Sequence, residues 1–553
     1  MDQIPFFQPY EKLNHWAQRF PHRKALSGQK LGSRKSAEFF SLTWGEVLER
    51  VKAYGSHFRS LGLKKGDRVA IQAKNQIAWV LADWAMNSVG IVSVPIYVQS
   101  LISEAEYIVK ESEVKLLLTD SIHTELSSSL NQISLEDWDI EAARCIGQEF
   151  NPDFLPRDEA CTIIYTSGTT GDPKGVMHAM QGISSGVQRG IAYLRIHSGD
   201  QLLSYLPLSH IAERVLCGFL PAYSGASVAF VESAEKVVRH IPEIKPTVFL
   251  AVPRIWDLMA LKLKKEIESN PMLQTRLESI PRFMRPWIFG FMVRRKLGFS
   301  RSRMFFSGAA KLNRDTAEYL KEFGIRIAEL YGLTETMGLS AFNNPKRPVF
   351  GSVGKPYPGV SLRLMSDGEI CLKSDHHFVG YYKKPAETAQ VLREGWFHTG
   401  DIGRQDDDGN LYITDRKKDI FKTSNGKYVA PTPIEFQLKK HLGIREVMVI
   451  GENRPYCIAL ASVDETPTSL QELAKHLEGV NSILPAHEKI KTLGFMTRPW
   501  TVDGGELTPT MKLKRQQILT NYSGIIEDVF SSSKGVLLVE TNERINRAHS
   551  RVQ

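Results

Sequence analysis

Cysteine is scarce in this chain and long apolar runs are missing, and each absence excludes a class of protein. The 553 residues include only five cysteines, which are odd in number, widely spread and without metal-ligand spacing. A disulfide framework is therefore not expected, and a reducing cytoplasm is the simplest compartment. Residues 1–10 lack the basic and apolar regions of a signal peptide. No stretch approaches the roughly 18 apolar residues that span a bilayer.

The composition that remains is that of an ordinary globular protein. Apolar residues make up 42% and charged residues 24%, and there is no internal repeat or low-complexity tract. The chain is long for one domain, so two or more are expected. A formal net charge of +9 suits anionic ligands such as nucleotides, phosphates or acidic lipid, or reflects no more than a basic surface.

Strand-like and helical patterns alternate over the first 420 or so residues, and the pattern changes after about Arg416. They follow the order strand 68–71, helix 77–86, strand 91–97, helix 103–112 and strand 115–118, with further strands at 247–252 and 304–306. This order predicts an α/β domain of layered sheets and helices with much parallel pairing. Beyond it, a smaller α+β domain is expected from strands at 445–450, 457–463 and 536–539 and helices at 433–441 and 469–477.

The strongest local signal is a loop after the apolar run that ends at Tyr165. Glycines let backbone N–H groups converge on an anion, hydroxyls add donors and a lysine adds charge. This composition predicts a phosphate-binding loop rather than a flexible surface loop, although its spacing is not that of the Walker motif. The candidate residues are Thr166, Ser167, Gly168, Thr169, Thr170, Gly171 and Lys174.

A second segment with chemical potential follows another apolar run. Just past a strand, the hydroxyl of Thr334 can lie on a phosphate and the carboxylate of Glu335 on Mg²⁺, while Tyr331 can stack on a base. A plain strand-end turn is the alternative. Upstream, Gly308 and Ala309 also follow a strand, and such small residues permit the close approach of a flat ring.

Two further segments carry charge. Asp401 can make a bidentate contact with two ribose hydroxyls, and Arg416 can reach the same sugar or its phosphate. Taken alone, Asp401 is equally well explained as a turn aspartate. Near the C-terminus Lys512 stands in the basic segment 507–515, for which the ordinary interpretation is a solvated surface charge.

Together, in this order and at these separations, the four segments resemble the adenylate-forming superfamily of acyl-CoA synthetases, nonribosomal adenylation domains and luciferases. The resemblance covers about residues 42–530 and is strongest to long-chain fatty acyl-CoA synthetases, through 205–214 and 415–431. It implies a large N-terminal ATP- and acyl-binding domain, residues 1–416. A small mobile C-terminal lid domain, residues 417–553, would carry the catalytic lysine.

The resemblance also implies a role for each matching residue. The loop from Thr166 to Lys174 would hold the β- and γ-phosphates, and Thr334 would contact the α-phosphate. Adenine would be flanked by Gly308, Ala309 and Tyr331, and the ribose would be held by Asp401 and Arg416. Glu335 would bind Mg²⁺ together with Thr166. The catalytic residues would be Lys512, Glu335, Thr334 and, near the acyl carboxylate, His210. Lys418 would be the hinge, and Gly426 would lie beside the pantetheine path.

The activity implied by the resemblance is activation of a fatty acid, expected to be long-chain, to acyl-AMP and its transfer to coenzyme A. ATP, Mg²⁺ and coenzyme A would be required, and no nucleic acid is expected as a partner. One alternative is a fatty acyl-AMP ligase that hands the acyl group to a carrier-protein thiol. The other is a nucleotide-binding regulatory protein without catalysis, against which the presence of Glu335, Asp401, Arg416 and Lys512 argues.

Two positions depart from the family pattern. The family carries Ser-Gly before its catalytic lysine, whereas this chain has Thr510-Met511, so Lys514 is the alternative to Lys512. After the phosphate loop, His178-Ala179-Met180 stands where Thr-His-x-Asn is usual. His178 is therefore either functional or a histidine packed in a helix.

The segment Arg282 to Arg303 is basic and aromatic and contains no acidic residue. One interpretation is an interfacial helix on an anionic membrane, which would place the protein peripherally at the inner membrane face. The other is a packed helix that leads to the strand at Met304. A fatty acyl substrate favours the first, because the acid would be drawn from lipid.

Overall fold

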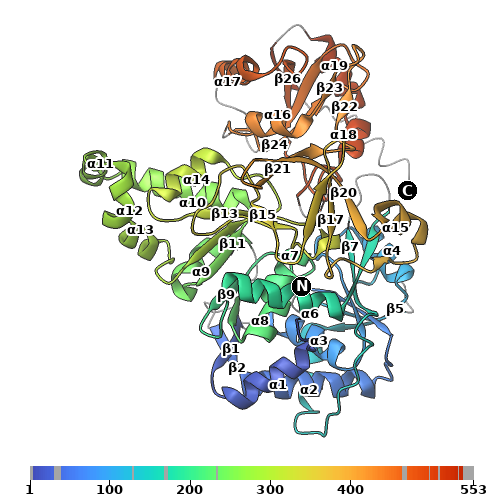
Figure 1. Ribbon diagram of the computed structural model, residues 1–553. Coiled ribbons are helices and arrows are strands. Elements are labelled where there is room, and N and C mark those ends of the chain that lie inside the picture. Colours follow the sequence, from blue (N-terminus) through green and yellow to red (C-terminus); the bar gives the residue numbers. More distant parts are fainter. Residues whose placement is uncertain are drawn as a thin grey trace.

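The computed structural model describes residues 4–29, 39–126, 130–166, 172–231, 234–441, 443–463, 470–496, 498–508, 511–532 and 535–539. A large N-terminal domain of four sheets lies below a smaller C-terminal domain in Figure 1. The predicted fold class, α/β with a small second domain, is confirmed. All five cysteines are free thiols, and four of them are buried.

The first sheet of the large domain has seven strands in the order β18-β8-β7-β4-β3-β5-β6. Their bounds are β3 Arg68–Gln72, β4 Val92–Pro95, β5 Val114–Thr119, β6 Asn131–Ser134, β7 Ala160–Thr166, β8 Lys174–Ala179 and β18 Gly380–Tyr381. β4, β3, β5 and β6 pair in parallel, and β8 runs antiparallel to β7. The strand–helix order predicted for residues 68–118 is confirmed.

Alternating side chains explain why helices cover both faces of this sheet. Val69 and Ile71 of β3 pack into one hydrophobic cluster, whereas Ala70 between them packs into another. Because successive side chains of a strand point to opposite faces, both faces must be covered. One face carries α2 Trp44–Ser60, α3 Ile77–Ser88, α5 Leu135–Ala143 and α6 Met180–Leu194, and the other carries α4 Ile102–Glu111.

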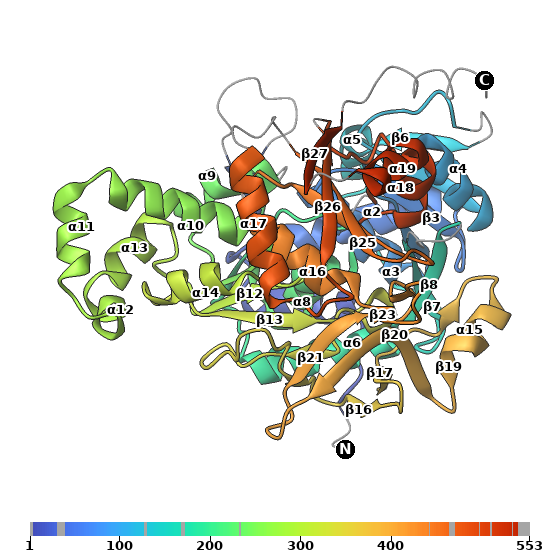
Figure 2. The same ribbon diagram turned by 90° about the horizontal axis from the view of Figure 1, so that it is seen from above.

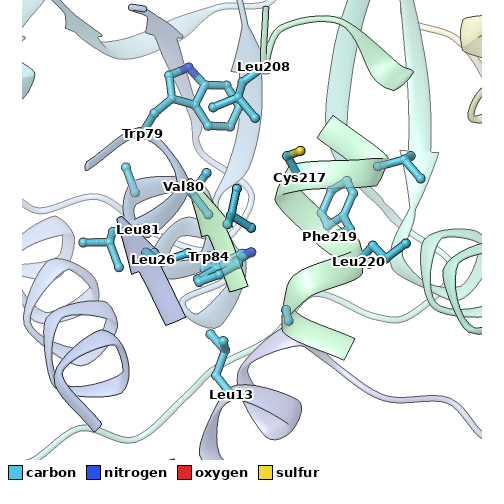
Figure 3. Packing of buried hydrophobic residues seen from close by; sticks show 14 of the residues in the cluster. Leu13, Leu26, Trp79, Val80, Leu81, Trp84, Leu208, Cys217, Phe219 and Leu220 are labelled. Atoms are coloured by element: carbon cyan, nitrogen blue, oxygen red, sulfur yellow. The ribbon is translucent and has the colours of Figure 1, made fainter. Parts of the chain in front are cut away.

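A second sheet, in the order β2-β1-β10-β9, shares this core. It consists of β1 Lys24–Gln29, β2 Phe39–Thr43, β9 Gln201–Ser204 and β10 Ser227–Phe230, and it packs with α1 Pro9–Arg19, α7 Ile211–Glu213, the π-helix η1 Arg214–Phe219 and α8 Leu220–Ser224. Figure 3 shows Trp79 and Trp84 of α3 opposite Phe219 and Leu220. The Trp84 indole N–H donates to the Gly218 carbonyl oxygen at 3.0 Å.

The third sheet, in the order β11-β12-β13-β14-β15, carries most of the remaining helices of the large domain. Its strands are β11 Val248–Ala251, β12 Met304–Ser307, β13 Ile327–Tyr331, β14 Ala341–Phe342 and β15 Lys355–Pro356. The helices of this region are α9 Ala234–Ile244, α10 Pro253–Glu268, α11 Pro271–Glu278, η2 Arg282–Met284, α12 Arg285–Ile288, α13 Gly290–Lys296 and α14 Arg314–Lys321.

The segment 282–303 has features of both of its interpretations. Its helical pieces η2, α12 and α13 pack by one side against the domain on the way to the strand at Met304, and their other side is strongly exposed. Both sides of the segment are apolar, so its sequence pattern alone does not indicate which side faces the core. None of the helices in the described part of the chain combines the length and apolar character that crossing a membrane needs.

The fourth sheet, β16-β17-β20-β19 with β21 beside β20, lies under the small domain. Its strands are β16 Ser361–Leu364, β17 Glu369–Lys373, β19 Leu392–Arg393, β20 Trp396–Gln405 and β21 Leu411–Arg416, with α15 Pro385–Val391 alongside. A short hairpin, β22 Phe421–Lys422 and β23 Tyr428–Val429, follows it.

The small domain is built on the sheet β24-β25-β26-β27. Its strands are β24 Glu446–Ile450, β25 Cys457–Ser462, β26 Ile490–Met496 and β27 Val536–Val539. One face packs against α16 Pro431–Leu438 and α17 Leu470–Ile483, and the other against α18 Arg515–Asn521 and α19 Ser523–Ser531. The α+β unit predicted beyond residue 416 is confirmed, although α17 extends six residues past the expected end at residue 477.

Candidate active site

The predicted phosphate-binding loop connects β7 and β8. Thr166, the last residue of β7, pairs with Lys174, the first residue of β8. The intervening candidates Ser167, Gly168, Thr169, Thr170 and Gly171 lie outside the described residues. The Lys174 ammonium pairs with Glu387 of α15 and lies 5.4 Å from the centroid of the Tyr381 ring. Both ends of the loop are thus fixed by one antiparallel strand pair.

Thr334 and Glu335 lie in a short 3-10 turn, η3 Thr334–Thr336, that follows β13. The strand-end turn given as the alternative is therefore present, and it is held on both sides by side chains from elsewhere. The Tyr381 hydroxyl donates to Glu335 Oε1 at 2.7 Å. The His178 ring N–H at Nε2 donates to the Thr334 carbonyl oxygen at 2.8 Å. The carboxylate and the carbonyl of this turn are thus oriented before any ligand binds.

His178 is buried on strand β8 and not in a helix, which corrects one interpretation of this residue. Burial lowers the pKa of its imidazole to about 3. The ring is therefore neutral at physiological pH, with one nitrogen protonated to bond the Thr334 carbonyl. His178 connects the strand after the phosphate loop to the turn that carries Glu335.

Asp401 and Arg416 face each other across β20 and β21. The two residues are register partners, and Arg416 Nε lies 3.1 Å from Asp401 Oδ1. The Tyr331 hydroxyl donates to Asp401 Oδ2 at 2.7 Å. Burial opposes the charge of Arg416, but Asp401 and then Asp419 outweigh it and raise the pKa of the guanidinium. Asp401 is thus held by two side chains from different strands and is not an isolated turn aspartate.

Gly308 and Ala309 lie beside this cluster. β12 and β13 are parallel, with Ser307 opposite Glu329, so the next two residues run alongside the end of β13. A Cβ built on Gly308 would be 4.0 Å from the Leu330 carbonyl oxygen, and Ala309 is exposed with φ +69°. The structure therefore brings the predicted adenine-binding residues next to Tyr331.

His210 caps the N-terminus of α7, where its Nδ1 accepts a hydrogen bond from the Ala212 N–H at 3.3 Å. Burial, and secondarily the charge of Lys512, lower the pKa of His210 to about 4. The large domain thus supplies a neutral imidazole that is close enough to Lys512 to respond to its charge.

Lys512 reaches this cluster from the small domain. The residue is exposed, yet protein lies around its ammonium and this partial burial lowers its pKa. The charges of Arg416, Asp401 and Glu335 also act on it. The Lys512 N–H donates to the Thr508 hydroxyl at 3.0 Å, and its carbonyl accepts from the Thr508 N–H at 2.8 Å. The charge of Lys512 is therefore near enough to the predicted site to interact with its charged groups, although the residue itself is exposed.

Lys514, the alternative catalytic lysine, is committed to another contact. Its ammonium lies 3.0 Å from Glu104 Oε1 of α4, and this ion pair joins the two domains. Arg515 pairs with Glu435 inside the small domain, where each of its two terminal nitrogens donates to one carboxylate oxygen at 2.7 Å. Within the segment 511–515, the geometry favours Lys512.

The hinge candidate lies close to this arrangement, and the pantetheine candidate lies on the hairpin that follows. Lys418 is the second residue after β21, and burial, followed by the charge of Arg416, lowers the pKa of its ammonium. Gly426 lies in the turn between β22 and β23 with φ +77°, and its N–H donates to the Thr423 carbonyl at 2.9 Å. No hydrogen bond among the described residues joins Gly426 to Lys512 or Asp401.

Three residues that hold the site were missed in the sequence. Tyr381 positions Glu335, Glu387 pairs with Lys174, and Glu104 pairs with Lys514. Each comes from a segment far along the chain from its partner and carries no motif. No signal in the sequence points to them.

Glu335 is the candidate metal ligand that the structure describes best. Among the described residues no cluster of three or more His, Cys, Asp or Glu side chains could hold a metal by itself. Mg²⁺ is bound in nucleotide sites by one or two carboxylates together with phosphates and waters. A single oriented carboxylate beside a phosphate-binding loop therefore fits that ion when ATP is bound.

Family models match both parts of the chain: residues 13–382 match the AMP-binding enzyme family, and residues 418–534 match the AMP-binding enzyme C-terminal domain. A long-chain-fatty-acid–CoA ligase of Mycobacterium bovis is 29% identical, with 89% of this chain and 92% of that protein covered. Long chain acyl-CoA synthetase 2 of Arabidopsis thaliana is 28% identical, with 95% and 92% covered.

Solved structures share the fold at lower identity. O-succinylbenzoate coenzyme A synthetase from Bacillus subtilis, in complex with AMP, has a TM-score of 0.74 at 22% identity and covers 92% of this chain and 97% of its own. A Mycobacterium tuberculosis fatty acyl CoA synthetase has a TM-score of 0.66 at 22% identity, with 94% and 99% covered. These likenesses extend over nearly the whole length of each chain.

Proposed function

The chain belongs to the family of AMP-binding enzymes, and from this premise we propose that it joins a fatty acid, preferably a long-chain one, to coenzyme A. The acid would first be converted to acyl-AMP with release of pyrophosphate, and the acyl group would then pass to the thiol with release of AMP. The observation that carries the proposal is the position of the segment 511–515 against the large domain, where the Lys514–Glu104 ion pair holds it and the charges of Arg416, Asp401 and Glu335 act on Lys512.

In the first step a carboxylate oxygen of the acid attacks the α-phosphorus of ATP, and the bond to pyrophosphate breaks. Catalysis of such a transfer rests on positioning and charge neutralisation and not on a protein nucleophile. Asp401 and Arg416 would hold the ribose, and Thr334 and the loop from Thr166 to Lys174 would contact the phosphates. Mg²⁺, held by Glu335 with Thr166, would neutralise phosphate charge.

The ammonium of Lys512 would stabilise the charge that is redistributed around the α-phosphate. In the second step the thiol attacks the acyl carbonyl and AMP leaves. Gly426, which would lie by the pantetheine path, and Lys512 both belong to the small domain. A rotation of that domain about Lys418 would move Lys512 away from the nucleotide and bring the pantetheine path at Gly426 into position, as domain movements do in other gated enzymes. We place the domain boundary between residues 416 and 417 on this ground.

The substrate class is tested by a panel of acids from acetate to oleate, with pyrophosphate release and coenzyme A consumption measured for each. Long-chain or medium-long acids should give the highest kcat/KM. A preference for acetate or for an amino acid would contradict the proposal. The acceptor is tested by offering coenzyme A and a phosphopantetheinyl carrier protein separately. Rapid acyl transfer to the carrier alone would identify an acyl-AMP ligase instead.

A further inference from the structure

The segment from η2 to α13, residues 282–296, exposes a row of large apolar side chains at the edge of the large domain. Figures 1 and 2 show α12 and α13 with α11 at the far end of the molecule, away from the small domain. Trp287 is 88% exposed, Phe283 77% and Phe291 69%. We call this row the exposed strip, and its members are Phe283, Met284, Trp287, Ile288, Phe291 and Met292.

The spacing of the strip shows that it is one side of the segment. Its members recur four residues apart, and residues at this spacing share a side of a helix. Phe289 and Val293, which alternate with them, are buried in a core cluster. Gly290 packs so closely that an added Cβ would lie 3.0 Å from the Phe323 carbonyl oxygen. The segment is therefore anchored by one side, and the strip is fixed facing solvent.

Basic residues flank the strip at both ends. Arg282 precedes it, and Arg295 and Lys296 follow at the next step of the same spacing. The Arg282 side chain is 81% exposed although its Nε lies 3.2 Å from Glu322, and Lys296 pairs with Glu266. Residues 282–303 contain seven basic and no acidic residues. The segment that carries the strip is thus basic, and Glu322, which also pairs with Arg285, and Glu266 offset part of its charge.

The exposed strip favours a binding partner that offers an apolar interior to its large side chains and negative charge to the basic residues around it. Soluble monomers rarely expose large contiguous apolar patches, and such patches mark interaction sites. Helices with aromatic residues on one side and Lys or Arg around them lie in the headgroup region of bilayers. A second copy of this chain would bring its own basic ends against the same basic ends, which opposes self-association.

We propose that the exposed strip docks on the surface of an anionic lipid bilayer. Trp287, Phe283 and Phe291 would enter the boundary between headgroups and acyl chains, and Arg282 and Arg295 would contact lipid phosphates. The segment would lie in the surface and not cross it. This docking does not depend on which acid the protein activates.

The test is sedimentation of the full-length protein with vesicles of phosphatidylcholine, with and without phosphatidylglycerol, at low and high salt. The wild-type protein should sediment with the anionic vesicles at low salt and be released by salt, since exposed charges are screened. Trp287→Glu with Phe291→Glu should lower the partition coefficient at least about tenfold. Arg295→Gln should lower it about fivefold on anionic vesicles, because one basic residue near such a surface is worth about that factor.

The matched control is Ile483→Glu, the same kind of change at a residue that is 65% exposed at the end of α17 in the small domain. It should leave sedimentation unchanged. An equal loss for Ile483→Glu, or no sedimentation of the wild type at low salt, would overturn the proposal. The proposal would also be overturned if the double variant sedimented with vesicles normally but had a smaller mass than the wild type in light scattering. The strip would then be an interface between two copies of the chain. The thermal melting temperature of each variant should be unchanged, which shows that a loss of sedimentation reflects lost docking and not unfolding. Trp287→Ser is a milder second change that tests the same point.

Discussion

The two domains of this protein hold their share of the active site in different ways. In the large domain the site residues are fixed by contacts within the same domain, as Asp401 is by Tyr331 and Arg416 and Glu335 by Tyr381. In the small domain the backbone of Lys512 bonds to the hydroxyl and the N–H of Thr508, and its charge interacts with Arg416, Asp401 and Glu335 across the boundary.

The contacts between the domains are polar. The Lys514–Glu104 ion pair crosses the boundary, and the Lys311 ammonium lies 5.2 Å from the centroid of the Phe436 ring. None of the hydrophobic clusters formed by the described residues contains side chains from both sides of the segment 414–420. Polar interfaces of this kind permit domains to move. Asp401 and Glu335 are thus oriented within one domain, whereas Lys512, the proposed catalytic charge, belongs to a domain joined to it by polar contacts.

The largest expected effect is that of Lys512→Ala on acyl-adenylate formation. Removing one charge that stabilises the transition state should slow this step by about two to three powers of ten. Pyrophosphate release with saturating acid and ATP measures it. Lys514→Ala is the matched control, because Lys514 lies two residues away but pairs with Glu104, and it should slow the step only a few-fold.

Glu335→Gln should lower the rate of adenylation by about a hundredfold, a loss of a few kcal/mol of charge stabilisation. It should also raise the Mg²⁺ concentration that half-saturates the enzyme, because the candidate metal ligand is lost. Glu318→Gln, at an exposed carboxylate paired with Arg314 in the same domain, serves as the control. An unchanged Mg²⁺ dependence would show that the metal is bound elsewhere.

Lys418→Pro should impair the second step and spare the first, because proline restricts the backbone of its own residue and of the one before it. Thioester formation should fall about tenfold or more, as hinge changes alter turnover without touching the chemistry. The Lys418 N–H makes no backbone hydrogen bond among the described contacts, so proline removes none. Lys418→Ala, which removes the charge and keeps the flexibility, should be near normal in coenzyme A consumption.

The structure brings several of the predicted site residues together, and their positions on strands explain why. Arg416 ends β21 opposite Asp401 in the middle of β20, and Thr334 and Glu335 follow β13 directly after a short loop. The residues that orient them could not be predicted, because Tyr381 reaches Glu335 through folding of a distant segment that has no pattern of its own.

The domain fold was also largely predictable, and the segment 282–303 shows why part of it was not. Hydrophobic periodicity locates a buried side only when the opposite side is polar. Here Phe289 and Val293 are buried, whereas Trp287 and Phe291 are equally apolar and exposed. Which side packs on the domain is decided by neighbouring elements such as the loop at Phe323, and these are distant in the sequence.

The smallest expected effect is that of Glu104→Gln, which removes the charge of the ion pair between the domains. A pair of this exposure is worth about 1 kcal/mol or less, so adenylate formation should slow about threefold. Glu106→Gln is the matched control on the same helix, where Glu106 pairs with Lys110 at 2.9 Å within α4. Equal effects of the two changes on pyrophosphate release would show that the Lys514 contact does not favour the closed arrangement.

The central claim is that the charge of Lys512 serves the first step only, because the small domain carries it. The most direct test runs the second half-reaction alone, with preformed acyl-AMP supplied to Lys512→Ala and coenzyme A consumption measured. The account predicts that this half-reaction proceeds at close to the wild-type rate while acyl-adenylate formation by the same variant is nearly abolished. Equal slowing of both half-reactions, or a selective loss of the first in Lys514→Ala instead, would contradict it.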